Sequence, residues 1–207
     1  AGCAGATADD DDSATTADDD GPVGDPATIP LEGACDLDRR LGGFVVEAYA
    51  ETSIVDGTVS DGVVPLSVLE QVMQAGDCQL MRRNNPFCDP PCDPDQTCDH
   101  DGECVPYPGN KSVGTVDVTG LAKDVTMEPT GTNEYYDTVM PHPAFEPGSA
   151  IRLEASGGDY AGFTLYGEGV SPVDTLDDIW IVRDGQDLEV TWTPAQQQYA
   201  EIHVRLN

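Results

Sequence analysis

Four cysteines crowded into residues 87–108 form the segment with the clearest capacity for chemistry. Cys88, Cys92, Cys98 and Cys104 are separated by three, five and five residues. Thiols at this density either pair as disulfides or bind zinc. Structural zinc sites usually join two short C-x2–4-C pairs across a longer gap, so the spacing favours disulfides, with zinc as the alternative. Disulfides persist in oxidising compartments, which predicts an exported protein.

Acidic side chains between these cysteines are candidate calcium ligands. Closely spaced carboxylates on loops fixed by disulfides suit Ca²⁺, which prefers oxygen ligands. The stretch from Asp99 to Gly102 resembles the centre of an EF-hand loop, although the first Asp and the final Glu of that motif are missing. The alternative is that these are solvated loop acids. The candidate ligands are Asp93, Asp95, Asp99, Asp101 and Glu103.

Three further cysteines make the total odd. Cys35 and Cys78 bracket the segment before the module, which predicts a disulfide between them. Cys3 stands alone within Ala-Gly-Cys, which resembles the end of a bacterial lipobox, and that resemblance implies a lipid on Cys3. Because Ala4 follows instead of Asp, it also implies an outer-membrane address. The alternatives are an intermolecular disulfide or a free thiol.

Charge and missing motifs exclude several function classes. With 39 acidic and 9 basic residues, the net charge of -30 argues against nucleic-acid binding, which depends on neutralising phosphates. No G-x-S-x-G elbow, H-E-x-x-H pair or phosphate-binding glycine loop occurs, and the three histidines lie in separate segments. We therefore expect no enzyme. Residues 1–29 form an acidic arm that holds eight Asp and no basic residue, and it is a candidate contact for a partner protein.

The elements that position these residues are predicted to be mainly β. Residues 30–86 read as a small β-rich domain, with strands in 44–50 and 53–55 and one short helix over 68–75. The helix prediction rests on a capping box at Ser67 and Glu70 and on Gly76 at its end. Leu69, Val72 and Met73 recur at helical spacing and are expected in the core.

A second, larger domain is predicted over residues 112–207. Apolar and polar residues alternate in 115–119, 151–155, 163–165, 188–192 and 202–206, with Pro, Gly and Asp breaks between these segments. This pattern is typical of an Ig-like β-sandwich. Asp184 and Gly185 are expected to form a hairpin turn, and Trp192 is expected to fill the core.

Two adjoining stretches carry a family resemblance. Residues 85–108 and 113–121 resemble cysteine-rich surface lipoproteins of myxobacteria and related bacteria, which implies an exported outer-membrane protein and no particular activity. The module also resembles small EGF-like modules in a general way. That resemblance implies the interleaved pairing Cys88–Cys98 and Cys92–Cys104.

Together these features predict a non-catalytic cell-surface lipoprotein that is a structural or accessory subunit of an assembly. Its partners would be other protein subunits, or copies of itself. The alternative is a surface module that binds carbohydrate or calcium, with Tyr135, Tyr136 or Trp180 as an aromatic platform.

Overall fold

The computed structural model describes residues 39–49, 51–65, 68–83 and 86–173, together with 181, 183–186, 190–193 and 203. Their regular structure is strands, so the mainly β prediction is confirmed. Within this part of the chain, no helix is long and apolar enough to cross a membrane. The acidic arm of residues 1–29 lies outside the described residues, as do Cys3 and Cys35.

One sheet is built from residues after 112. Its antiparallel strands are β7 (Val116–Thr119), β8 (Val125–Met127), β10 (Ala150–Ala155) and β11 (Phe163–Glu168), in the order β11-β10-β7-β8. Side chains alternate along them, so Val116 and Val118 are buried while Asp117 and Thr119 are exposed. The period-two pattern of the sequence predicted three of these strands.

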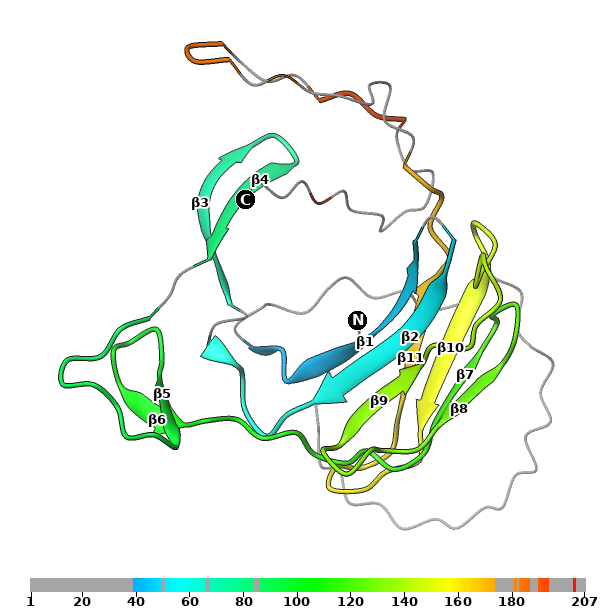
Figure 1. The fold of residues 1–207 in the computed structure, drawn as a ribbon, viewed down its shortest axis with the longest axis horizontal. Coiled ribbons are helices and arrows are strands. Elements are labelled where there is room, and N and C mark those ends of the chain that lie inside the picture. Colours follow the sequence, from blue (N-terminus) through cyan, green and yellow to red (C-terminus); the bar gives the residue numbers. More distant parts are fainter. Residues whose placement is uncertain are drawn as a thin grey trace, which may run out of the picture.

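The second sheet joins distant parts of the sequence. Strand β2 (Ser53–Val59) lies between β1 (Gly42–Ala48) and β9 (Glu134–Asp137), and both pairings are antiparallel. The strands predicted within the 30–86 domain therefore belong to the same body as strands of the 112–207 domain. Figure 1 shows the two sheets lying face to face.

A single core fills the space between the sheets. Val55 and Tyr135 come from the three-stranded sheet, and they pack with the inward residues of the four-stranded sheet, such as Val116 and Leu153. Phe44 of β1 packs on this core, with its ring 5.6 Å from that of Tyr135. Burying aliphatic and aromatic side chains from both sheets is the main stabilising contribution, because apolar burial scales with area.

Residues 61–109 form an insertion that leaves this body and returns to it at one place. Ser60 and Asn110 form an isolated antiparallel bridge, and Lys111 N donates to Val59 O at 2.7 Å. Asp61 tightens the closure, since its carboxylate accepts a hydrogen bond from Gly109 N and lies 3.0 Å from Lys111 Nζ. Both contacts lower the pKa of Asp61.

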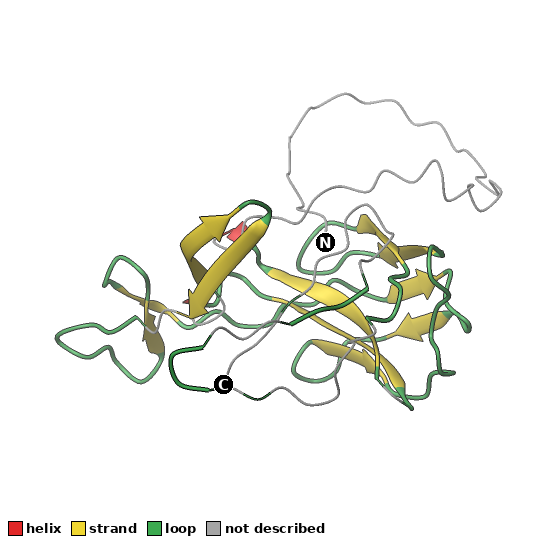
Figure 2. Cartoon of the chain, turned by 90° about the horizontal axis from the view of Figure 1, so that it is seen from above, coloured by secondary structure: helices red, strands yellow, loops and turns green. Residues whose placement is uncertain are grey.

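The insertion carries two small hairpins. The first pairs β3 (Leu69–Ala75) with β4 (Cys78–Arg83), and the second pairs β5 (Gln96–Cys98) with β6 (Cys104–Pro106). Figure 2 shows both hairpins on one side of the two sheets.

The helix predicted over 68–75 is wrong, because these residues form β3. Gly76 has a φ of 60° and occupies a two-residue turn with Asp77, which joins Ala75 directly to Cys78. A left-handed glycine suits both the end of a helix and a tight hairpin, and here the hairpin forms. Val72 and Met73 were expected in a core but are 47% and 61% exposed.

The end of the chain is described only in part. Asp184 and Gly185 form a turn, as predicted, with Gln186 N donating to Arg183 O. Trp192 is 37% exposed, which corrects its expected place in the core. The predicted strand over 188–192 is described at residues 190–192, where Trp192 forms a bridge, and the strand over 202–206 is described only at His203, so the Ig-like topology stays a prediction.

Candidate functional site: the outer face of the three-stranded sheet

The outer face of the three-stranded sheet gathers polar and aromatic side chains from three separate segments. Because side chains alternate along a strand, burying Phe44, Val55 and Tyr135 turns their neighbours outward. The register then sets Val45 beside Asp56, and Asp56 beside Tyr136, in one row across the sheet. A second row contains Gly43, Thr58 and Glu134.

These two rows border an open hollow of about 560 Å³. Gly43 contributes no side chain, and a Cβ placed there would meet no atom within 4 Å, so the hollow has space above this strand. Arg40 lines the hollow ahead of β1, and Tyr136 lines it from β9 with 59% of its surface exposed.

Carboxylates dominate the electrostatics of this face. Burial, and then the nearby Glu47 carboxylate, raise the pKa of Asp56 above its ordinary value. Tyr49 donates a hydrogen bond to Glu47, and this bond raises the pKa of the phenol. A ligand that brings hydrogen-bond donors to Asp56 would offset the cost of keeping this half-buried carboxylate charged.

The acidic residues of the cysteine module do not converge. Asp99 uses its Oδ1 atom to accept hydrogen bonds from the backbone N–H groups of Asp101 and Glu103, at 3.0 and 2.8 Å. This carboxylate therefore shapes its own turn. Within the described residues, the structure brings no three of Asp93, Asp95, Asp99, Asp101 and Glu103 together as ligands.

The cysteines of the module are paired as the EGF-like resemblance implied. Disulfides join Cys88 to Cys98 and Cys92 to Cys104. The predicted bond between Cys35 and Cys78 is wrong, because Cys78 carries a free, exposed thiol beside the Gly76–Asp77 turn. Cys78 belongs to the β3–β4 hairpin, whose side chains are mostly exposed, so its position at the end of a segment was a poor guide to its pairing.

The candidate aromatic platform divides between the core and the surface. Tyr135 is 1% exposed and belongs to the core. Its hydroxyl accepts a hydrogen bond from Val113 N and donates one to Gly114 O, both at 2.9 Å. Tyr136 points the other way and remains on the open face. Trp180 lies outside the described residues.

The fold also brings together a serine and a histidine that sequence reasoning missed. Ser53 Oγ lies 3.0 Å from Nδ1 of His142, although 89 positions separate the two residues. Such a pair can activate a hydroxyl for nucleophilic attack. Ser53 is only 1% exposed, however, so its Oγ has no room for a substrate carbonyl, and its contact with the exposed His142 is a part-buried structural hydrogen bond.

Comparison with known proteins finds no family model, no curated protein and no solved structure that matches the chain.

Proposed function

We propose that the chain is a non-catalytic structural or accessory subunit of an extracellular or membrane-associated assembly. On this proposal Cys3 carries the lipid that anchors it to the outer membrane, and other protein subunits, or copies of itself, are its partners. The two disulfides of the module support an exported location, because they persist only where thiols are oxidised. The Ser53–His142 contact adds no support for an enzyme, because Ser53 is buried.

The exposed apolar surface of the β3–β4 hairpin is the observation that carries this proposal. Met73 and Leu80 pair across the two strands and are 61% and 55% exposed. Among the described strands, neither β3 nor β4 packs extensively on any other element. A lone two-stranded hairpin is marginally stable in water, and contiguous exposed apolar residues mark contact surfaces. A partner subunit that covers this hairpin would stabilise it.

The test is the size of the native complex extracted from the cell envelope with mild detergent. The unmodified chain should migrate in a complex much larger than itself. The double variant Met73→Glu with Leu80→Glu should shift to the size of the free chain, because it places charges in the contact. Val139→Glu is the matched control, since Val139 is 76% exposed on the main body and should not affect the complex.

Two results would contradict the proposal. One is an unmodified protein that leaves the envelope as a single chain. The other is a hairpin variant that stays in the complex while its β-sheet circular dichroism is unchanged. Mass spectrometry of the mature N-terminus tests the lipid on Cys3 separately.

The outer face of the three-stranded sheet supports a second candidate function, carbohydrate binding. The exposed ring of Tyr136 offers an apolar face for the C–H groups of a sugar ring. Asp56, Thr58, Glu134 and Arg40 border the same hollow and supply hydrogen-bond partners for hydroxyl groups. Calcium binding has less support, because the five module acids do not come together.

Affinity electrophoresis in gels containing cell-surface polysaccharides tests this candidate. Tyr136→Ala should abolish any retardation of the unmodified chain, and Asp56→Asn should weaken it. Tyr166→Ala, on β11 of the other sheet, is the control and should migrate like the unmodified chain. Equal retardation of all three variants would place binding elsewhere.

A further inference from the structure

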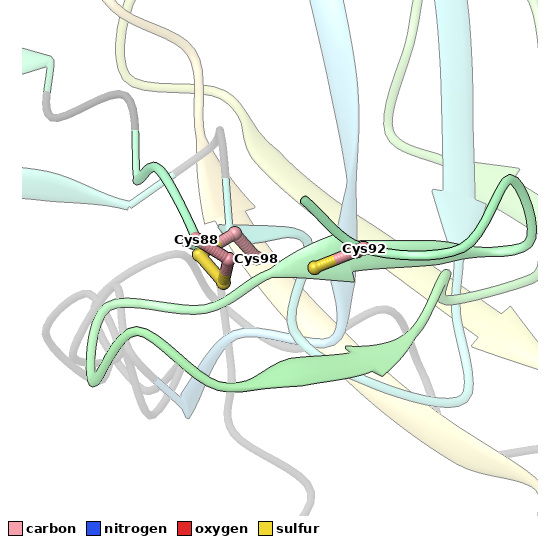
Figure 3. A group of neighbouring side chains, drawn as sticks. All are labelled: Cys88, Cys92 and Cys98. Atoms are coloured by element: carbon pink, nitrogen blue, oxygen red, sulfur yellow. A yellow bond between two sulfur atoms is a disulfide. The ribbon is translucent and has the colours of Figure 1, made fainter. Parts of the chain in front are cut away.

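Three sulfur atoms of the cysteine module form a compact cluster. Cys88, Cys92 and Cys98 each have their Sγ atom within 4.8 Å of the other two. Figure 3 shows the Cys92 side chain directed toward the Cys88–Cys98 disulfide. Cys104 joins the cluster through its bond to Cys92. Three sulfur atoms therefore share one small volume, and the fourth is bonded to one of them.

The Cys88–Cys98 disulfide is also the core of the module. Cys88 and Cys98 are the buried residues of segment 86–108, and the residues around them are exposed or half-buried. Cys98 lies directly opposite Cys104 in the β5–β6 hairpin, while Cys88 and Cys92 come from the preceding loop. Hydrogen bonds in the hairpin, from Asp99 N to Glu103 O and from Tyr107 N to Asp95 O, hold this arrangement from outside the cluster.

Zinc requires four ligands, and the reduced module would offer four thiolates. Tetrahedral zinc binds thiolate sulfur at about 2.3 Å, which places the sulfur atoms roughly 3.8 Å apart. The Sγ atoms of Cys88, Cys92 and Cys98 already lie within 4.8 Å of one another, and reduction would free Cys104, now bonded to Cys92, to complete the set. Residues 86–108 contain acidic side chains and no Lys or Arg, so no positive side chain of the module opposes a divalent cation.

We propose that the reduced module binds one Zn²⁺ through Cys88, Cys92, Cys98 and Cys104. A dithiol reductant supplies two electrons and two protons to each disulfide, and two dithiol molecules become oxidised. Zinc then displaces the four thiol protons as four Zn–S bonds form. The disulfide form and the zinc form are two alternative cross-linked states of the same module. The zinc form is the one available where thiols are kept reduced.

Cobalt substitution tests this site. The whole protein is reduced with dithiothreitol, freed of reductant without oxygen, and titrated with Co²⁺. We expect one Co²⁺ per chain, with the intense thiolate-to-cobalt charge-transfer band and the visible bands of a tetrahedral site. One equivalent of Zn²⁺ should abolish these bands. The oxidised protein should give none of them.

Variants separate the module from the other thiols. A chain with Cys3→Ser, Cys35→Ser and Cys78→Ser keeps only the four module cysteines and should give the full spectrum at the same stoichiometry. Cys92→Ser in that background should lose the four-thiolate intensity. Because this variant could also unfold the module, alkylation provides a second measurement. In the triple variant, Zn²⁺ should slow the reaction of all four thiols with iodoacetamide by at least tenfold.

Clear outcomes would overturn the proposal. These are a reduced chain that binds no more Co²⁺ than the oxidised chain, a spectrum that disappears in the triple variant, or thiols that zinc does not protect. None of them bears on the accessory-subunit proposal, which depends on the hairpin surface.

Discussion

Tyr135 and Tyr136 are consecutive residues with opposite roles. Tyr135→Phe removes the hydroxyl that bonds to Val113 N and Gly114 O inside the core. We expect a loss of about 1–3 kcal/mol in the free energy of unfolding, because buried polar groups are left without partners. Tyr136→Phe is the control and should change stability by less than about 0.5 kcal/mol, since its ring is on the surface. Urea unfolding measures both, and equal effects would contradict this division.

Asp56 makes the stability of the fold depend on pH. Its pKa is raised in the folded state, so the charged form destabilises the fold at neutral pH, and this cost disappears as the pH falls through that raised pKa. At pH 7, Asp56→Asn should therefore raise the free energy of unfolding by about 0.5 kcal/mol or less, and the melting temperature should rise slightly. The gain should vanish near pH 4.

Melting curves of both proteins between pH 4 and pH 8 measure this difference. Asp124→Asn, at an exposed loop position, serves as the control for removing one negative charge. A gain that stays constant across the range, or a loss of stability at pH 7, would show that burial of Asp56 is not the cause.

Single elements were predictable where their pattern is local. The alternation of residues 115–119, 151–155 and 163–165 predicted β7, β10 and β11, because a sheet with one buried face imposes that period. The helix predicted over 68–75 was wrong because its evidence was also local. Gly76 suits both the end of a helix and a tight hairpin turn. Of the candidate site, Tyr136 was predicted as a platform residue, but its place beside Asp56 was not, because the two residues meet only through the pairing of β2 with β9.

Gly120 allows the chain to adopt a left-handed backbone conformation directly after β7. It has a φ of 85°, and a Cβ there would lie 1.9 Å from the carbonyl oxygen of Ala150 on β10. Gly120→Ala should cost about 1–3 kcal/mol for the backbone conformation alone, and more for displacing β10. Gly131→Ala is the matched control because open space surrounds that position. Urea unfolding compares the two variants, and equal midpoints would contradict the prediction.

At the scale of the whole molecule, the insertion and the two-sheet body are separable. Because Ser60 and Asn110 are bridged, residues 61–109 can be replaced by an Asn-Gly turn without moving either end. The shortened chain should keep its core and one cooperative unfolding transition. We expect it to lose no more than about 1–2 kcal/mol, since only surface contacts such as the Asp61–Lys111 ion pair are removed. Calorimetry tests this, and a shortened chain without a transition would show that the insertion supports the body.

The pairing of β2 with β9 also sets the order in which the protein can fold during synthesis. The β1–β2 hairpin emerges first, but the strand beside it and the opposite sheet follow only after the whole insertion has been made. Such distant pairings close slowly, and the inward faces of Phe44 and Val55 stay accessible to water until then. We therefore expect the newly made chain to be prone to aggregation until its second sheet exists.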